Sequence, residues 1–318
     1  MKKIIALALA LCMLLGCSAA LAEGSYTIGI VQLMQHVALD AASQGFMDAF
    51  SELVGAENVT FDYQLAGGDQ GTCVPIVNGF VSNPDMSMIL ANATPALQAA
   101  MEATDTLPIL ATAITDYATA LGVTEGWTGV TGINVSGTCD LAPLDGQAAM
   151  IKELFPDATS IGLLYCSAEP NSQYQVDVIA AELAKLGYEN VQYFAFSDSN
   201  DLASITQAAC DAVDVIYIPT DNTAATYTET VANVVLPAKV PVVAAEEGIC
   251  SGCGVATLTI DYYDLGYATG KMAYEVLVNG ADVSAMTIES APQFTKTYNP
   301  AICAELGIEI PEGYEAIE

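Results

Sequence analysis

Short apolar runs alternate with helical repeats along most of the chain. Each run is typical of a buried strand, and each following segment has apolar residues at three- and four-residue steps, as on the buried face of a helix. In the first half this pattern predicts strands at 26–33, 59–65, 86–91 and 107–113, with helices at 37–53, 74–81 and 95–103. Strands that alternate with long helices indicate parallel sheets built from right-handed βαβ units.

The second half repeats this order after an interruption. A Gly- and Thr-rich passage at 122–138 breaks the alternation, and a helix at 144–155 follows it. The pattern then predicts strands at 160–165, 191–196, 213–218 and 240–244, with helices at 172–186, 202–212 and 224–235. Two similar halves predict an α/β fold of two doubly wound parallel-sheet lobes.

The last part of the chain is assigned from the fold type and not from a residue pattern. A strand at 257–260 and a helix at 262–278 are expected, and the helix would return to the first lobe. We therefore expect one lobe from 26–138 plus 261–289, and a second from 139–260 plus 290–318.

Polar residues follow several of the predicted strands directly. One strand ends at Pro219 and presents the segment 220–223 before a helix, and the earlier strand at 86–91 runs into Thr94 and Pro95 in the same way. In open α/β sheets, ligands bind beyond the carboxyl ends of the strands. This rule places six polar segments at one cleft: 32–36, 92–94, 115–116, 165–172, 220–223 and 246–248.

The residue types in this cleft favour binding of a zwitterion. Thr94, Ser172 and Thr223 at helix starts offer donors to a carboxylate. Four acidic residues are candidate acceptors for an ammonium group: Asp116, Glu169, Asp221 and Glu246. That pairing suits an amino acid, although each of these side chains is also of a type that simply caps a helix.

Motifs of enzymes are missing from the sequence. It contains no GxSxG, GxxxxGK or HExxH motif and no GxGxxG at a strand–helix junction. The one histidine, His36, precedes a predicted helix, and the adjacent Glu246 and Glu247 do not share one face of a strand. We therefore predict a binding protein without a catalytic residue, a cofactor or a metal.

Composition limits the class of partner. The 318 residues are 53% hydrophobic, enough for two domains with a large core, and 38 acidic residues outnumber 7 basic ones for a formal charge of −31. Binding of nucleic acid needs clustered Lys and Arg, which this chain does not have. The charge indicates a self-repelling, well-dissolved protein.

The N-terminus has the features of an export signal. Lys2 and Lys3 precede an apolar stretch at 4–15 that is too short to span a bilayer, and Leu14-Leu15-Gly16-Cys17 resembles a bacterial lipobox. Residues 1–22 are expected to form the signal and anchor region, with Cys17 lipidated. Cleavage after Ala20-Leu21-Ala22 is the alternative, and no later apolar run is long enough for a membrane span.

Seven of the nine cysteines follow the expected anchor. An odd number cannot all pair within the chain, so at least one thiol is expected to be free unless it pairs with another molecule. Cys250 and Cys253 have CxxC spacing in an expected Gly-rich turn. Free thiols, a local disulfide, and metal or redox chemistry all remain open for this pair.

Taken in order, the motifs resemble a known family, the substrate-binding lipoproteins of ABC importers of the tryptophan/tyrosine type, which have a type I periplasmic-binding-protein fold. The matching stretches lie throughout the mature chain: Gly29–Gln32, His36–Asp40, Gln44–Phe46, Gly68–Gln70, Ala93–Pro95, Ala113–Asp116, Asn134–Asp140, Tyr165–Ser172, Pro219–Thr223, Glu246–Gly248 and Ile260–Gly266. The sequence departs from the family at Val37, Cys139, Cys250 and Cys253.

The resemblance implies a monomeric, lipid-anchored, extracytoplasmic receptor. It would capture an aromatic amino acid between two lobes that close on a hinge and deliver it to an ABC permease and its ATPase. The resemblance places the ligand pocket at nine residues: Thr94, Thr115, Asp116, Glu169, Asn171, Ser172, Asp221, Asn222 and Glu246. A nucleoside- or sugar-binding receptor of the same fold is the alternative, and an enzyme is the third reading.

Overall fold

The computed structural model describes residues 25–123, 125–291 and 293–317. The expected signal region and the lipidated Cys17 lie outside the described residues. Within the described ranges, we find no helix with both the length and the apolar character needed to cross a bilayer.

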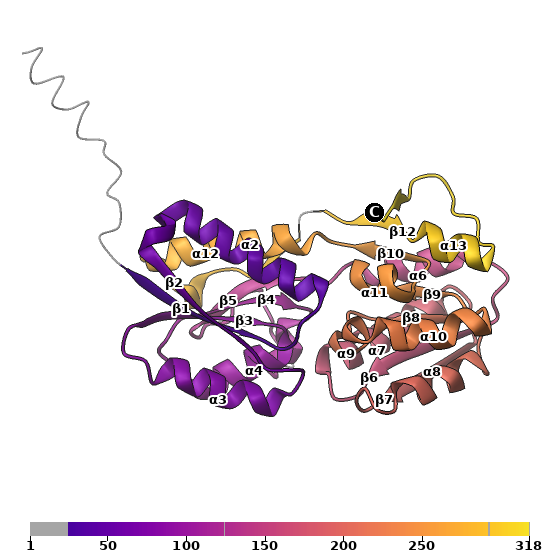
Figure 1. Ribbon diagram of the computed structural model, residues 1–318, viewed down its shortest axis with the longest axis horizontal. Helices are drawn as coiled ribbons and strands as arrows, with labels where there is room; N and C mark the ends of the chain where they lie inside the picture. The colour runs from indigo at the N-terminus through magenta and orange to yellow at the C-terminus, as the bar shows by residue number, and fades with distance from the viewer. Residues whose placement is uncertain (1–24, 124, 292, 318) are drawn as a thin grey trace, which may run out of the picture.

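The chain forms two α/β lobes side by side (Figure 1). The sheet of the first lobe has six strands in the order β11-β5-β4-β3-β1-β2, and all neighbouring pairs are parallel. Its strands are β1 (Tyr26–Gln32), β2 (Val59–Leu65), β3 (Met86–Asn92), β4 (Ile109–Ile114), β5 (Val135–Cys139) and β11 (Glu289–Ser290). Its helices are α2 (Val37–Val54), α3 (Gln70–Val81), α4 (Thr94–Ala103), α5 (Tyr117–Ala120) and α12 (Tyr262–Leu277).

The sheet of the second lobe has seven strands in the order β13-β12-β10-β9-β8-β6-β7. Only the β10–β12 pair is antiparallel among the described pairs. The strands are β6 (Ser160–Cys166), β7 (Asn190–Phe196), β8 (Val215–Ile218), β9 (Val242–Ala244), β10 (Ala256–Thr259), β12 (Thr295–Tyr298) and β13 (Glu315–Ala316). The helices are α6 (Leu144–Leu154), α7 (Pro170–Lys185), α8 (Leu202–Cys210), α9 (Asn222–Thr226), α10 (Thr228–Ala238), α11 (Glu247–Cys253) and α13 (Pro300–Leu306).

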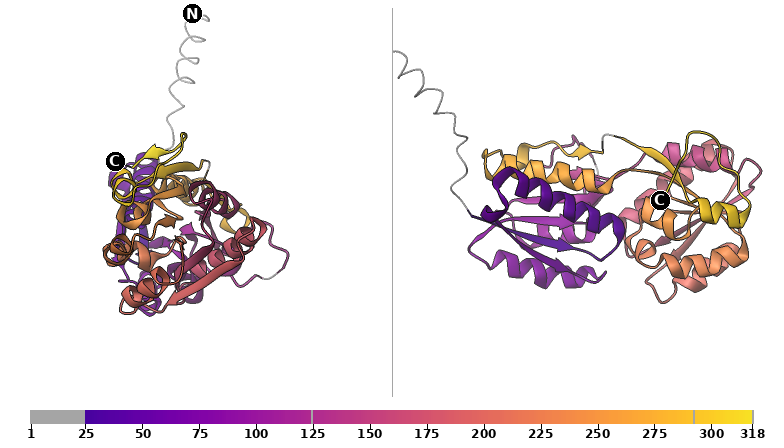
Figure 2. Two further views of the ribbon diagram at one scale, coloured as in Figure 1. Left: turned by 90° about the vertical axis from the view of Figure 1, so that its right-hand side faces the viewer. Right: turned by 45° about the horizontal axis from the view of Figure 1, so that its top comes forward.

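The chain passes between the two sheets three times. It leaves the first sheet after β5, returns after β10 through α12 and β11, and enters the second sheet again at β12. The return places α12 beside α2, although the two helices are far apart in the sequence (Figures 1 and 2).

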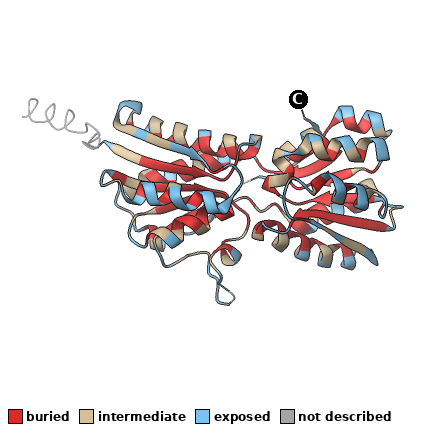
Figure 3. Cartoon of the chain, turned by 60° about the horizontal axis from the view of Figure 1, so that its bottom comes forward, coloured by how far each residue is buried: buried red, intermediate tan, exposed pale blue. Residues whose placement is uncertain are grey.

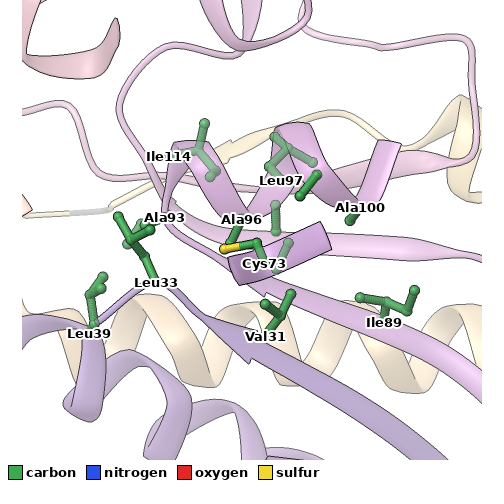
Figure 4. Packing of buried hydrophobic residues seen from close by; sticks show 14 of the residues in the cluster. Val31, Leu33, Leu39, Cys73, Ile89, Ala93, Ala96, Leu97, Ala100 and Ile114 are labelled. Carbon is green, nitrogen blue, oxygen red and sulfur yellow. The ribbon is translucent and has the colours of Figure 1, made fainter. Parts of the chain in front are cut away.

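Each sheet is buried on both faces, as expected for a parallel sheet covered by helices. In the first lobe, Val31 and Ile89 join a cluster that includes Cys73 of α3 and Leu97 of α4 (Figure 4). Neighbouring strand residues face the other side and pack with Phe46 of α2 in a second cluster. Figure 3 shows buried strands inside both lobes and exposed outer faces on the helices.

The fold class predicted from the sequence is confirmed, but two local predictions are wrong. The passage at 122–138 interrupts the predicted alternation of strands and helices, yet it contains most of β5, whose Val135 and Gly137 are buried. A β-carbon at Gly137 would lie 1.9 Å from the Ala111 carbonyl oxygen, so close strand packing requires glycine there. The strand therefore lacks the apolar run that would have revealed it.

The second wrong prediction concerns Cys250 and Cys253, which lie in helix α11 and not in a Gly-rich turn. The side chain of Glu246 caps this helix by accepting hydrogen bonds from the first free backbone N–H groups. A β-carbon at Gly252 would lie 2.3 Å from Thr228 Oγ1, so this glycine allows α11 to pack closely on α10. All seven cysteines in the described part of the chain are free thiols.

Helices α2 and α12 pack so closely that glycine is needed at their contact. A β-carbon at Gly45 would lie 2.1 Å from the Tyr263 carbonyl oxygen, and one at Gly266 would lie 1.8 Å from the Ala42 carbonyl oxygen. The helix pair begins at the cleft, with His36 just before α2 and Tyr262 as the first residue of α12. This contact therefore sets the positions of two cleft residues.

Candidate functional site

A cavity lies between the lobes, where the carboxyl ends of the strands from both sheets face each other. Its volume is about 20 Å³, far below the roughly 300–1,000 Å³ typical of ligand pockets, so the lobes must move apart before a ligand of amino acid size can enter. The lining residues come from strand ends and helix starts in both lobes: His36, Ala38, Leu39, Ala113, Thr115, Asp140, Asn171, Thr220, Asp221, Asn222, Ala225, Glu246 and Tyr262.

Five of the nine residues expected at the pocket line this cavity. They are Thr115, Asn171, Asp221, Asn222 and Glu246. The other four, Thr94, Asp116, Glu169 and Ser172, lie nearby but are not among its lining residues. For these four, a position at a strand end or helix start did not lead to a position on the cavity wall.

Two of these four residues, Asp116 and Ser172, lie at helix starts in their own lobes. The Asp116 carboxylate caps α5 by accepting a 2.6 Å hydrogen bond from the Thr119 backbone N–H. Ser172 is fully buried in the first turn of α7. Thr94 is also buried, and its hydroxyl has no hydrogen-bond partner among the described residues.

The Glu169 carboxylate mainly holds the start of α9. One oxygen accepts from the Asn222 backbone N–H at 3.0 Å and from its side-chain amide at 2.6 Å. The other accepts from the Thr223 backbone N–H at 2.9 Å and from its hydroxyl at 2.8 Å. Glu169 therefore orients Asn222, which does line the cavity.

Three buried carboxyl groups line the cavity, and none of its lining residues is Lys or Arg. Asp221 accepts from the backbone N–H groups of Cys166 at 2.6 Å and Ala224 at 2.8 Å. Glu246 accepts from the Gly248 backbone N–H at 2.7 Å and also from that of Ile249. Both groups thus have fixed partners within their own lobe.

Burial makes these carboxyl groups harder to ionise. It raises the pKa of Glu246 to about 7. Burial, and then the nearby Glu169 carboxylate, raises the pKa of Asp221. Because backbone N–H groups offset only part of this cost, a cation that entered the cavity would stabilise the ionised forms.

Of the three carboxyl groups, Asp140 has the fewest hydrogen-bond partners. It is 4% exposed, and its Oδ2 accepts a 3.0 Å hydrogen bond from the Tyr262 hydroxyl. Its Oδ1 has no partner among the described residues. Burial raises the pKa of Asp140 to about 6. A buried acceptor of this kind is costly unless a ligand supplies a donor.

Two hydrogen bonds join the lobes across the cavity. His36 Nε2 lies 3.2 Å from Asn222 Oδ1, and the hydroxyls of Thr115 and Thr220 lie 3.2 Å apart. Burial lowers the pKa of His36, so its ring is neutral at pH 7. Since the Asn222 amide nitrogen donates to Glu169, its oxygen must be the acceptor and His36 Nε2–H the donor.

Sequence reasoning left four of the polar lining residues out of the predicted pocket: His36, Asp140, Thr220 and Tyr262. Asp140 directly follows β5, the strand that the hydrophobic pattern did not reveal. Tyr262 starts α12, which was placed only from the fold type. The segments 32–36 and 220–223 that the sequence placed at the cleft already contained His36 and Thr220, so position at a strand end was the signal available for these two.

The described residues form no metal centre. Across 25–123, 125–291 and 293–317, His, Cys, Asp and Glu side chains do not gather in any group of three or more that could hold a metal ion. The cavity chemistry is therefore carried by its carboxyl, amide, hydroxyl and imidazole groups.

Comparison with protein families gives a match over most of the chain. Residues 27–316 match the family described as ABC transporter substrate binding protein. A tyrosine-binding protein of Clostridioides difficile (strain R20291) is 37% identical over 252 residues, which are 79% of this chain and 72% of that protein.

Solved structures are similar over nearly the whole chain. An ABC domain from Streptococcus pneumoniae in complex with L-Trp is 33% identical, with a TM-score of 0.86 over 92% of this chain and 100% of that one. The ligand-free, open structure of an adhesive substrate-binding protein from Clostridium difficile is 36% identical, with a TM-score of 0.68 over 92% and 99% of the two chains.

Replacing Asp140 by asparagine tests whether its charge is uncompensated. The pKa of Asp140 is about 6 in the folded protein against an ordinary value of 3.8. The folded state therefore binds this proton more tightly, and ionisation of Asp140 lowers stability as pH rises from about 4 to above 6. A two-unit difference corresponds to on the order of 3 kcal/mol.

We expect Asp140→Asn to raise the free energy of unfolding at pH 7.5 by up to that amount and to leave it unchanged at pH 4. Urea denaturation at both pH values measures this. The exposed Asp105→Asn removes the same charge elsewhere and should show no such difference. An Asp140→Asn protein no more stable than wild type at pH 7.5 would mean that its neighbours already compensate the carboxylate.

Proposed function

Because the chain belongs to the family of ABC transporter substrate-binding proteins, we propose that it captures an aromatic amino acid between its two lobes. The ligand is tryptophan, tyrosine or phenylalanine, and it is bound without turnover and passed to an ABC permease. One observation carries this proposal: the cavity holds three buried carboxyl groups, one with an unpartnered oxygen, and no cationic lining residue.

The ligand ammonium group is the missing cation in this scheme. It would donate to Asp140 Oδ1, which has no partner among the described residues, and interact with the carboxyl group of Glu246 on the same cavity wall. A charge-assisted hydrogen bond contributes roughly 1.5–3 kcal/mol. The same contact relieves the cost of burying the carboxylate, so it stabilises the complex more than an exposed ion pair would.

The rest of the ligand meets donors and apolar walls. The hydroxyls of Thr115 and Thr220 can donate to a ligand carboxylate. Leu39, Ala113 and the Tyr262 ring supply apolar surface for an aromatic side chain. The names of two similar proteins, one tyrosine-binding and one bound to L-Trp, support an aromatic ligand.

A nucleoside or sugar receptor of the same fold is the weaker candidate. Such a ligand offers hydroxyl donors but no positive charge. It would leave the carboxyl groups of Asp140, Asp221 and Glu246 in a closed cavity without a counter-charge. A cationic group is therefore the feature that separates the two candidates.

The described conformation corresponds to a closed receptor in this proposal. The two inter-lobe hydrogen bonds, His36 to Asn222 and Thr115 to Thr220, require the lobes to be together. The TM-score is 0.86 with the L-Trp complex but 0.68 with the ligand-free, open structure, at similar sequence identities. A difference in lobe arrangement accounts for this contrast.

The proposal includes the organisation of the receptor in the cell. We place the first lobe at 26–138 plus 261–289 and the second at 139–260 plus 290–318. The membership of the strands in two sheets supports these bounds to within one residue, since Cys139 of β5 and Ser290 of β11 lie in the first sheet. The protein would be a monomer outside the cytoplasm, anchored through lipidated Cys17, and would work with a permease and an ATPase. The lipobox-like sequence before Cys17 supports the anchor.

Binding of free amino acids to the mature protein tests the ligand class. We expect micromolar or tighter binding of an aromatic amino acid by titration calorimetry, and at least a 10-fold loss in Asp140→Asn because the neutral amide interacts more weakly with an ammonium. Asp116→Asn, outside the cavity, should bind as wild type does. Binding of a sugar or nucleoside, with none of the aromatic amino acids, would reject the proposal.

Removing the hydrogen bond between His36 and Asn222 tests whether it stabilises the closed arrangement of the two lobes. In His36→Ala the ring no longer donates to Asn222, so the closed form should lose stability and the ligand should dissociate roughly 5- to 10-fold faster. Small-angle scattering should show a larger radius of gyration for the ligand-free variant than for wild type. Identical scattering and dissociation rates would remove His36 from the closing mechanism.

A further inference from the structure

Asn171 has a buried side-chain oxygen that the binding scheme described above leaves without a donor. Its side chain lines the cavity, the residue is 4% exposed, and Oδ1 has no partner among the described residues. It therefore shares the property that marks Asp140, but it is neutral. A buried acceptor that lacks a donor destabilises the protein unless a ligand supplies one.

The orientation of the Asn171 amide is fixed by its neighbours. Its Nδ2 donates to the Thr220 carbonyl oxygen at 3.0 Å and to the Glu169 carboxylate at 3.3 Å. Both partners are acceptors only, so exchanging the nitrogen and oxygen would place two acceptors against each other. The oxygen is consequently held as an acceptor and directed away from those partners.

Asn171 also differs from Asp140 in how its burial can be relieved. A carboxylate in a closed cavity can take up a proton from water, whereas an amide oxygen cannot at any ordinary pH. The Asn171 oxygen thus needs a donor from outside the protein. The two groups also have different hydrogen-bond partners: Tyr262 for Asp140, and Thr220 and Glu169 for Asn171.

We propose that Asn171 is a specificity-determining residue that accepts a hydrogen bond from the ligand side chain. This inference rests on the proposed function, in which Asp140 binds the ammonium group. The ligand class is then narrowed to aromatic amino acids with a ring donor, a phenol O–H or an indole N–H. Phenylalanine, which has the same amino acid group but no ring donor, is discriminated against.

The discrimination rests on the free-energy cost of leaving a buried hydrogen-bond acceptor unpaired, which is larger than the gain from pairing it. A site built to hydrogen-bond a group on its ligand rejects the analogue that lacks this group, because the protein acceptor is then left buried and unpaired. Tyrosine and phenylalanine differ by one hydroxyl, so they form a minimal pair for this test. The expected difference in affinity is roughly 10- to 100-fold.

Calorimetric dissociation constants of L-tyrosine, L-tryptophan and L-phenylalanine provide the experiment, measured for wild type and Asn171→Ala. In wild type, the tighter of tyrosine and tryptophan should bind at least 10-fold more tightly than phenylalanine. In Asn171→Ala this ratio should fall to within about 3-fold of one. Because the readout is a ratio within one protein, a general loss of stability does not mimic it.

Gln175→Leu is the matched control. Gln175 is a buried amide one turn further along α7 that does not line the cavity, and both of its amide atoms have partners, including Thr220 Oγ1 at 2.6 Å and the Thr220 backbone N–H at 3.1 Å. Its replacement should lower stability and leave the ratio as in wild type.

Two outcomes would overturn the inference in different ways. If wild type bound phenylalanine as tightly as the tighter of tyrosine and tryptophan, Asn171 would not select a ring donor. An equal loss of all three ligands in Asn171→Ala would assign Asn171 to the amino acid group common to them. The inference would then fall while the proposed function stood. No binding of any of the three ligands by wild type would overturn both together.

Discussion

The structure depends on the burial of negative charge without a matching cation. Asp140, Asp221 and Glu246 reach one cavity, and none of its lining residues is Lys or Arg. Glu246 accepts two backbone N–H groups at the start of α11, and Asp221 accepts one from the end of β6 and one from the start of α9, which partly replaces the lost water. Asp140 Oδ2 accepts from the Tyr262 hydroxyl, and its Oδ1 has no partner among the described residues, so this oxygen can accept from an external donor.

The fold makes this arrangement possible by bringing strand ends from two sheets together. Each lobe has hydrophobic clusters on both faces of its sheet, which stabilise it independently of the cavity. The close glycine contact between α2 and α12 fixes His36 and Tyr262 at the cleft edge. Two buried oxygens without a hydrogen-bond partner among the described residues, Asp140 Oδ1 and Asn171 Oδ1, belong to residues that line the cavity, where a ligand can supply donors.

The sequence predicted the two-lobe fold because its signal is local: apolar runs and helical repeats identify strands and helices one by one. The cavity wall was harder to predict. Thr94, Asp116, Glu169 and Ser172 do occur at strand ends or helix starts, but local position does not say whether a side chain faces the cavity or its own helix. Asp140 was missed for a different reason: the strand before it, β5, is buried, but its residues around Gly137 are small and polar and do not form an apolar run. The contact of His36 with Asn222 joins residues 186 positions apart, which no local pattern can indicate.

The central claim is that the cavity is built around a ligand cation. The most direct measurement compares the unfolding temperature of the protein at pH 7.5 with a saturating aromatic amino acid and with its deaminated acid, such as L-tyrosine and 3-(4-hydroxyphenyl)propionate. A ligand that binds only the folded state raises this temperature, and the rise grows with the logarithm of the ligand concentration divided by its dissociation constant. The account predicts a clear rise with the amino acid and none with the deaminated acid. An equal rise with both would show that the buried carboxyl groups do not recognise the ammonium group.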